Sequence, residues 1–224
     1  EGDFIARLSP QFELGAEGKG LLLNALYRAD GRRYLRFTEL NSISHYASAG
    51  MRAGLSEKTK LEAKEVFTYT KESLEAVETG IQAGRGGILS NTVSLMAEQA
   101  VGRKTSLAAN FSDSVLRFDS PSAIDSRTSS TGIKGIYKMR ETLSLNANYA
   151  FTLFHFDRSD NDFETHSLLA GFTQHPSPGL DIDISGGAVY TQKRATRDWI
   201  GEAKIRKAAE RSSLPISMSI STHS

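Results

Sequence analysis

Apolar and polar residues alternate with a period of two along most of this chain. The pattern is clearest in residues 142–156. There the apolar set is Leu143, Leu145, Ala147, Tyr149, Phe151 and Leu153, and the polar set is Ser144, Asn146, Asn148 and Thr152. Because successive side chains of a β-strand point to opposite sides, this segment is predicted to be a strand with one apolar and one polar face. Helical spacing does not explain the pattern.

The same alternation restarts after each of a series of polar connections. After a short lead at residues 4–14, the predicted strands are 20–28, 42–55, 60–70, 88–101, 105–118, 131–139, 142–156, 165–175, 180–191, 198–210 and 213–222. Two segments also fit a helix. Residues 71–83 fit a short one, and the composition of residues 202–211 favours one, although we interpret that segment as strand because it keeps the alternation.

The predicted connections alternate between short and long. The short ones are 57–59, 102–104, 140–141, 177–179 and 211–212, and the long ones are 29–41, 71–87, 119–130, 157–164 and 192–197. In an antiparallel sheet this order collects the tight turns at one end and the long loops at the other. Outer-membrane β-barrels have this asymmetry, whereas a soluble sandwich with Greek-key connections has no reason to separate its turns by length.

Strand length also favours a membrane protein. Many predicted strands run over eleven to fifteen residues, whereas strands of ordinary sheets have about five or six. Crossing the hydrocarbon of a bilayer takes roughly 9–11 tilted residues. The sequence therefore predicts an all-β fold, an antiparallel up-and-down transmembrane β-barrel of about 12 strands, formed by residues 1–224 as one domain in the bacterial outer membrane.

The composition excludes several other classes. The chain has no run of eighteen apolar residues, so a membrane-spanning helix is excluded. It has no cysteine, which excludes disulfides and thiolate metal sites, and its net charge of +1 gives no field that would recruit nucleic acid. Its hydrophobic fraction is 39%, a modest value that a barrel tolerates because the polar lumen face dilutes the lipid-facing residues.

The order of the connections also predicts a missing strand. If the tight turns are periplasmic, the predicted strands 20–28 and 213–222 both run outward, so the chain would end outside, unlike a closed even-stranded barrel. Residues 4–14 supply a twelfth strand, which would run inward from outside. The chain closes with Thr222-His223-Ser224 and not with an aromatic strand. We therefore expect the barrel to lack at least its C-terminal strand.

Several segments of the C-terminal half resemble a known family. They are Thr142-Leu143-Ser144-Leu145, the loop from Phe156-Asp157 to Thr165-His166-Ser167, His175-Pro176-Ser177-Pro178-Gly179-Leu180, Ser185-Gly186-Gly187-Ala188-Val189-Tyr190-Thr191 and Asp198-Trp199-Ile200-Gly201. This series resembles bacterial outer-membrane β-barrel proteins associated with exopolysaccharide and PEP-CTERM sorting systems. The resemblance implies a porin-like barrel of undefined substrate, with partner proteins in the envelope or in polysaccharide export.

Charged residues opposite the apolar faces are candidates for the barrel lumen. Lys or Arg facing lipid at mid-depth costs about 2–4 kcal/mol, so such charges must point inward in a membrane barrel. Their mixed signs indicate a lumen that holds ion pairs or water, without strong ion selectivity. The predicted lumen-facing residues are Glu62, Lys64, Lys134, Lys138, Asp181, Asp183, Glu202, Lys204 and Arg206. In a soluble sheet the same residues would form the solvent face.

Aromatic residues near the strand ends are candidates for interfacial girdles, because amphipathic rings favour the boundary between membrane and water. They are Tyr27, Tyr69, Phe118, Tyr137, Phe154, Phe156, Phe172, Tyr190 and Trp199. Aromatic residues are also enriched in ordinary strands, so this pattern alone does not separate a barrel from a soluble sheet.

The sequence predicts no catalytic site, no metal site and no cofactor. Asp157, Asp160 and Asp162 are candidates for Ca²⁺ binding, but their spacing misses the EF-hand pattern and outer loops are commonly acidic. His155 and His166 flank this loop and would suit zinc as a pair, although polar residues at the water interface are the simpler interpretation. Residues 15–20 are glycine-rich but lack the Ser or Thr of a phosphate-binding loop, which favours a hairpin.

Three functions are consistent with these patterns. The first hypothesis is a non-enzymatic outer-membrane β-barrel that acts as a porin-like pore, conduit or scaffold, in contact with outer-membrane lipid and lipopolysaccharide and with no nucleic-acid partner. The second is a soluble or surface-exposed β-sandwich that binds a partner and packs its apolar faces together. The third is a hydrolase embedded in a barrel, for which His155 and His166 are the residues to replace.

Overall fold

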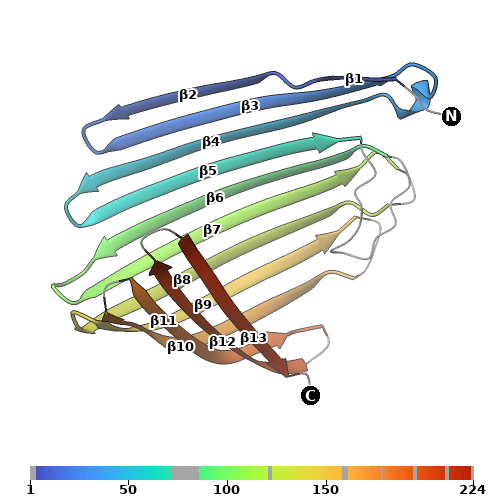
Figure 1. The fold of residues 1–224 in the computed structure, drawn as a ribbon. Coiled ribbons are helices and arrows are strands. Elements are labelled where there is room, and N and C mark those ends of the chain that lie inside the picture. The colour runs from blue at the N-terminus through green and yellow to red at the C-terminus, as the bar shows by residue number, and fades with distance from the viewer. Residues whose placement is uncertain are drawn as a thin grey trace.

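The computed structural model describes residues 4–71, 86–120, 123–157, 161–177, 179–193, 196–209 and 212–222. Within these ranges the chain forms one antiparallel sheet in which consecutive strands are neighbours (Figure 1). The strands are β1 (Ile5–Leu8), β2 (Gln11–Gly18), β3 (Leu21–Tyr34), β4 (Ser42–Ser56), β5 (Thr59–Thr70), β6 (Ile88–Ala100), β7 (Thr105–Phe118), β8 (Ser126–Arg140), β9 (Leu143–Phe156), β10 (Phe163–Ser177), β11 (Leu180–Thr191), β12 (Thr196–Ala209) and β13 (Ser212–Thr222). A short 3-10 helix, η1 (Thr38–Leu40), follows β3. None of the helical structure in these ranges is long and apolar enough to cross a membrane.

The first edge of the sheet is one strand interrupted at Ser9 and Pro10. β1 pairs with residues 31–34 of β3, and β2 pairs with residues 21–28 of the same strand. Proline has no backbone N–H to donate, but the Pro10 carbonyl accepts a 3.1 Å hydrogen bond from the Ala29 amide, which keeps the two parts in line. The thirteen strands therefore occupy twelve positions across the sheet, as the sequence predicts.

The all-β, antiparallel up-and-down arrangement is confirmed, but the sheet is not closed. Figure 1 shows it curving, so that β11–β13 cross the direction of β2–β7 in the view. At one edge β1 and β2 pair with β3, and at the other β13 pairs with β12. No pairing between these two edges occurs in the described part of the chain.

Tight turns and long loops lie at opposite ends of the sheet, as predicted. The tight turns follow β2, β4, β6, β8, β10 and β12, and the longer connections follow β3, β5, β7 and β9. The predicted long loop 192–197 is shorter than expected, because β12 begins at Thr196 and leaves a connection between β11 and β12 no longer than the one between β6 and β7. Two of the turns contain a glycine with positive φ, Gly20 at 74° and Gly179 at 76°. We refer to the two ends below as the turn end and the loop end.

Two strands are longer than predicted, so the predicted loops 29–41 and 119–130 are wrong in extent. β3 continues to Tyr34 and β8 begins at Ser126. The added residues pair with neighbouring strands on both sides, although their side chains no longer alternate between apolar and polar. The predicted strand within residues 202–211 is confirmed to Ala209. Of the segment 71–83, which fits a helix in sequence, all but Lys71 lies outside the described residues.

Strand pairing defines two faces of the sheet, which we name the apolar face and the polar face. Residues directly opposite each other in an antiparallel pair point to the same side. Leu145 pairs with Tyr137 of β8 and with Phe172 of β10, and the remaining pairs carry this side across the whole sheet. Members of the apolar face are Leu23, Met51, Leu61, Leu95, Phe111, Ile133, Tyr149, Leu168, Ile184 and Trp199.

In strands β2–β12 the middle of the apolar face carries no lysine or arginine, but Glu65 lies near the centre of β5 with the apolar Ala63 and Phe67 on either side. Towards the loop end this middle part is bordered by polar and charged residues, namely His45, Asp113, Arg127, Glu164 and Arg197. Towards the turn end it is bordered by Thr59, Gln99, Thr105 and Gln174. The apolar side chains therefore form a continuous band between two polar borders, which we name the apolar band.

The sheet encloses no hydrophobic core among the residues whose side chains the structure describes. Among the described residues, Ile88 is the one buried apolar residue, at 5% exposure. The accessible surface of the chain is 16487 Å², whereas a folded soluble protein of 24.5 kDa exposes roughly 10,000 Å². Large side chains of the apolar band are exposed, such as Leu168 at 61%. This face therefore needs a further apolar partner to be stable in water.

Replacing Gly20 by Ala is expected to lower the free energy of unfolding by about 1–2 kcal/mol. A Cβ disfavours the positive φ of this residue and would lie 3.1 Å from the Gly54 carbonyl oxygen across the turn. Gly18→Ala is the matched control, because nothing lies within 4 Å of a Cβ at that position. Urea unfolding followed by the fluorescence of Trp199 measures the difference. Equal losses in the two variants would contradict the role assigned to the Gly20 conformation.

Candidate functional site

The polar face is the candidate functional site. All nine charged residues predicted to face a lumen lie on it, because their partners across the strands belong to the same side. Lys64 pairs with Ser94, and Asp183 pairs with Lys204. The other members of the set are Glu62, Lys134, Lys138, Asp181, Glu202 and Arg206.

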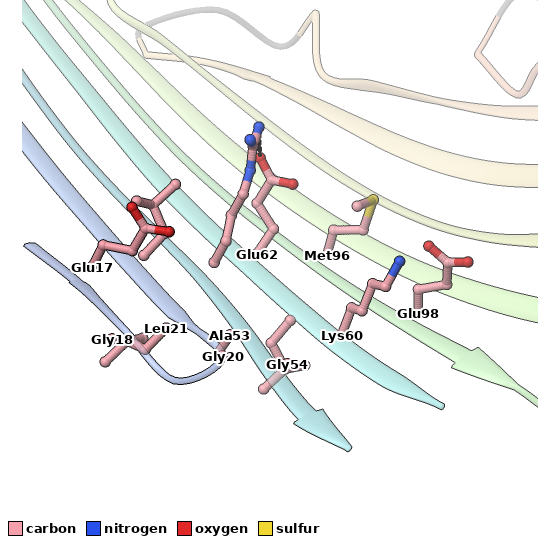
Figure 2. A pocket seen from close by; sticks show the side chains of 13 residues that line it. Glu17, Gly18, Gly20, Leu21, Ala53, Gly54, Lys60, Glu62, Met96 and Glu98 are labelled. Carbon is pink, nitrogen blue, oxygen red and sulfur yellow. Dashed lines mark hydrogen bonds and ion pairs between the residues drawn. The ribbon is translucent and has the colours of Figure 1, made fainter. Parts of the chain in front are cut away.

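A hollow of about 490 Å³ opens on the polar face near the turn end of β2–β6 (Figure 2). Its charged lining residues are Glu17, Arg52, Lys60, Glu62 and Glu98. Arg52 lies directly opposite Glu62, and the Arg52 Nη2 and Glu62 Oε1 atoms are 3.1 Å apart. Lys60 lies directly opposite Glu98. Charges of opposite sign are therefore paired across neighbouring strands, which limits the net field in the hollow.

A second hollow of about 250 Å³ lies along β3–β5 and shares Arg52 and Glu62 with the first. Lys64 adds a further cation to its lining. Gly50 lines it as well, and a Cβ on this residue would collide with the side-chain amide of Asn24. The two hollows together form a groove in which charges of both signs stand beside apolar residues such as Leu22 and Met96.

Ion pairs also cover the polar face on β10–β12. Arg206 Nη2 lies 2.9 Å from Asp183 Oδ2, and the Thr173 hydroxyl donates a 2.6 Å hydrogen bond to the other oxygen of Asp183. Lys204 Nζ lies 2.6 Å from Glu202 Oε1. These side chains remain between 30% and 61% exposed, so water reaches them. This part of the face is therefore hydrated and close to neutral.

Six of the nine predicted girdle residues lie on the apolar face, namely Tyr27, Tyr69, Tyr137, Phe172, Tyr190 and Trp199. The other three, Phe118, Phe154 and Phe156, lie on the polar face. These three therefore cannot belong to the same girdle as the other six, because they stand on the opposite face of the sheet. Phe154 and Phe156 stack instead on Phe163, with ring centroids 4.5 and 6.1 Å apart. Phe154 and Phe156 are separated from Ser144 by an even number of positions along β9, so they lie on the same polar side as Ser144.

Two histidines of the apolar face each lie between tyrosines of the neighbouring strands. The groups are Tyr27–His45–Tyr69 on β3–β5 and Tyr149–His166–Tyr190 on β9–β11. In each group the hydroxyl of the first tyrosine lies 2.8 Å from the histidine Nδ1, and the histidine ring lies 6.3 Å from the second tyrosine ring. The two groups thus run from the middle of a strand towards the loop end. Tyr149 lies in the middle of β9 opposite Ile133, whereas Tyr69 and Tyr190 lie near the loop ends of β5 and β11.

The residues considered for metal binding lie at the loop between β9 and β10. His155 Nδ1 lies 2.6 Å from Asp162 Oδ2, and His155 Nε2 lies 3.3 Å from Asp157 Oδ1. Asp160 lies outside the described residues. In the described part of the chain, no group of three His, Cys, Asp or Glu residues is arranged to hold a metal ion. His155 therefore acts in this loop as the partner of Asp162.

His166 is engaged separately from His155. It lies directly opposite Phe151 on β9, and its Nδ1 contacts the Tyr149 hydroxyl. The zinc pair that the two sequence positions suggest is therefore not formed, because each histidine ring is oriented by a different partner.

Several residues of the polar face are absent from the predicted site. They are Glu17, Arg52, Lys60 and Glu98, which line the larger hollow. Arg52 could have been assigned to the polar face from the sequence, because it lies between Met51 and Ala53, which both belong to the apolar face. The ion pair between Asp113 and Arg127, 2.9 Å long, is also absent from the prediction. Its sequence signal is hidden because the predicted loop 119–130 includes Arg127.

Comparison with known proteins supports the fold. No family model matches the chain, and no curated protein matches it significantly in sequence. Among solved structures, the chain is similar to the ferric-catecholate import receptor Fiu of E. coli K12 in its closed form, with a TM-score of 0.53 and 8% sequence identity. The match covers 98% of this chain and 45% of the receptor chain. The receptor is a β-barrel, so the fold of this chain is that of a barrel wall and spans less than half of the receptor's length.

The pKa of Asp162 is expected to lie below the usual value of an aspartate. The first cause is the hydrogen bond that the Phe156 amide donates to its carboxylate, and the second is His155. The loop is therefore stabilised by this carboxylate above the ordinary aspartate pKa of about 3.9, and the stabilisation is lost as the pH falls through the lowered pKa. A carbon-detected NMR titration measures this pKa. In His155→Gln it is expected to rise part of the way back, and an unshifted Asp162 in the unsubstituted protein would contradict the geometry.

Proposed function

We propose that this chain forms the wall of a non-enzymatic β-barrel in the bacterial outer membrane, with its polar face lining a water-filled lumen. One observation carries the proposal. The strand register gathers all nine predicted lumen charges on one face and leaves on the other an apolar band whose middle carries no lysine or arginine. A sheet in water has no need to keep an exposed face free of these cations, whereas a sheet in lipid does, because each exposed Lys or Arg costs about 2–4 kcal/mol at mid-depth.

The height of the apolar band supports this location. In β9 the apolar residues run from Leu143 to Leu153 on alternate positions, which agrees with the roughly 9–11 tilted residues that cross the hydrocarbon. Tyr69 and Tyr190, which lie near the loop ends of β5 and β11, would then lie close to one membrane surface, where aromatic rings with a polar tip are favoured.

The charge distribution supports a pore or conduit without strong ion selectivity. Cross-strand pairs such as Arg52–Glu62 and Arg206–Asp183 leave the polar face hydrated but nearly neutral. Small hydrophilic solutes are the class of cargo that fits such a surface. In a scaffold role the same wall would surround a plugged lumen. Such a barrel would not conduct ions, whereas an open pore would.

The alternative of a soluble β-sandwich is less well supported. A sandwich buries its apolar residues between two packed sheets, whereas the described residues form one sheet with Ile88 as the buried apolar residue. Purification without detergent tests this alternative. A monodisperse protein in plain buffer would favour the sandwich, and aggregation that detergent reverses would favour the membrane barrel.

A barrel-embedded hydrolase is the third possibility, and the geometry gives it little support. A histidine acting as general base must present a free ring nitrogen to a nucleophile. In a triad a carboxylate holds Nδ1 and the base is Nε2, so the contact of His155 Nδ1 with Asp162 is compatible with that role. The Nε2 atoms, however, face carboxylates: that of His155 lies 3.3 Å from Asp157 Oδ1, and that of His166 lies 3.8 Å from Glu164 Oε1. Assay of the unsubstituted protein for lipid hydrolysis tests this option, and measurable activity that His155→Ala or His166→Ala abolishes would revive it.

The assignment to a subclass of barrels also belongs to this proposal. The segments quoted from the C-terminal half resemble barrels of exopolysaccharide and PEP-CTERM systems, which would make proteins of the envelope or of polysaccharide export its partners. Outer-membrane lipid and lipopolysaccharide would contact the apolar band. Affinity capture from an exopolysaccharide-producing bacterium that encodes the chain tests the protein partners.

Ala147→Arg is expected to destabilise the protein by about 2–4 kcal/mol in a lipid bilayer, because this residue lies in the middle of the apolar band. Asn148→Arg is the matched control, since it puts the same charge one residue further along β9 on the polar face, opposite Lys134. Unfolding by denaturant from vesicles gives both free energies. Equal effects of the two substitutions would contradict a lipid-facing apolar band.

Exchange of lumen charge is expected to change ion selectivity if the barrel conducts. Lys134→Glu combined with Lys138→Glu reverses two exposed cations of the polar face on β8. The reversal potential in a planar bilayer under a salt gradient should then shift towards cation preference. Lys58→Glu combined with Lys104→Glu is the control, because those residues lie in tight turns. An unshifted potential would remove the two lysines from the conducting path, and absent conductance would favour the scaffold.

A further inference from the structure

A third hollow, of about 690 Å³, lies at the loop end of β1, β3 and β4. Gly31 is part of its lining, and its partners across the strands are Leu8 on one side and Ile43 on the other. All three residues belong to the apolar face, and Leu8 and Ile43 are 74% and 56% exposed. Because glycine has no side chain, the space between the two apolar side chains stays open. The hollow therefore offers apolar walls on the outer side of the sheet.

Two exposed cations, Arg33 and Lys71, line the same hollow. Arg7 and Arg32 also contribute to the lining, but both pair with Asp30 on the polar side of the sheet. Within the described residues neither Arg33 nor Lys71 is in an ion pair, and none of the lining residues is acidic. A positive potential therefore faces the apolar side of the sheet at this point.

The remaining wall has an amphipathic character. His45 and Tyr69 line the hollow and belong to the first Tyr–His–Tyr group, which reaches the loop-end border of the apolar band. Arg33 lies further towards the loop end than Gly31, and the apolar band lies on the other side, towards the turn end. From the loop end the order along the strands is therefore Arg33, then the apolar Leu8 and Ile43 beside Gly31, then His45 and Tyr69. A bound lipid would place its phosphate at the cation and the start of its acyl chain on the apolar side chains directly beside it.

We propose that this hollow binds the phosphate headgroup of an anionic lipid, with Arg33 and Lys71 as its cationic ligands and with an acyl chain against Leu8 and Ile43. The proposal rests on the membrane location proposed above. A lipid is favoured over free phosphate because a soluble anion would gain nothing from the apolar walls, whereas an acyl chain buries them. The volume is within the range of ligand sites, about 300–1,000 Å³.

Lipid retention tests this site. The full chain is reconstituted in vesicles of equal parts phosphatidylglycerol and phosphatidylcholine with identical acyl chains, released into mild detergent and analysed by native mass spectrometry. The unsubstituted protein is expected to retain phosphatidylglycerol in preference to phosphatidylcholine. Arg33→Glu combined with Lys71→Glu should lower that preference about tenfold, because opposite charges at hydrogen-bond distance are replaced by like charges. Inorganic phosphate added after release should not displace the lipid, and displacement by phosphate would overturn the role of the acyl chain.

Two further variants make the result specific. Lys58→Glu combined with Lys104→Glu makes the same change in net charge at the turn end, and it should keep the preference. Gly31→Phe should remove bound lipid without removing a charge, because its ring fills the hollow, while its Cβ meets the Leu8 carbonyl oxygen at an ordinary 3.8 Å. Equal retention in both double variants would overturn the proposal.

Vesicle flotation separates this proposal from the proposed function. Variants that float with the vesicles but lose the lipid preference confirm the site. Flotation of the unsubstituted protein without any lipid preference overturns the site and leaves the membrane barrel in place. Failure of the unsubstituted protein to float overturns both.

Discussion

Cross-strand pairing is the constraint on which the rest of this structure depends. Each antiparallel pair fixes which residues share a side, and a slip of one residue would move every side chain of a strand to the opposite face. The pairing is continuous from β3 to β13. The face on which Leu145 lies therefore fixes the face of Trp199, Ile133 and Leu23. The separation of lysine and arginine from the apolar band follows from that register, and no enclosed core contributes to it.

The absence of a core among the described residues gives the apolar band its meaning. A soluble domain of this mass would bury its large side chains, whereas Leu168 and Ile133 remain 61% and 60% exposed. In the proposed function lipid would resolve this, because hydrocarbon would take the place of a second apolar layer. The polar borders at Thr59 and Gln99 on one side and at Asp113 on the other limit the height of the surface that lipid would cover.

The polar face and the border of the apolar band have different chemical capacities. On the polar face, charges are largely compensated across strands, as in Arg52–Glu62, which suits passage or storage of water more than capture of a charged ligand. At the loop end of β1–β5, by contrast, Arg33 and Lys71 remain uncompensated by any described residue, beside an open space made by Gly31. Selective binding is therefore more readily explained at the border of the apolar face than on the polar face.

Much of this architecture is local and is readable from the sequence. Alternation identifies the cores of eleven strands and the face of residues such as Lys64 and Asp183, because a strand's period of two is a property of the backbone. Connection length predicts which end each turn occupies. Other features required the tertiary structure. The extra length of β3 and β8 depends on pairing with both neighbours, so polar residues such as Arg127 look like loop in sequence. The hollows join residues from distant strands, and the face of Phe118 follows from its opposition to Ile88. The hollows and the face of Phe118 depend on which residues of neighbouring strands lie opposite each other, and the sequence of one strand does not specify this register.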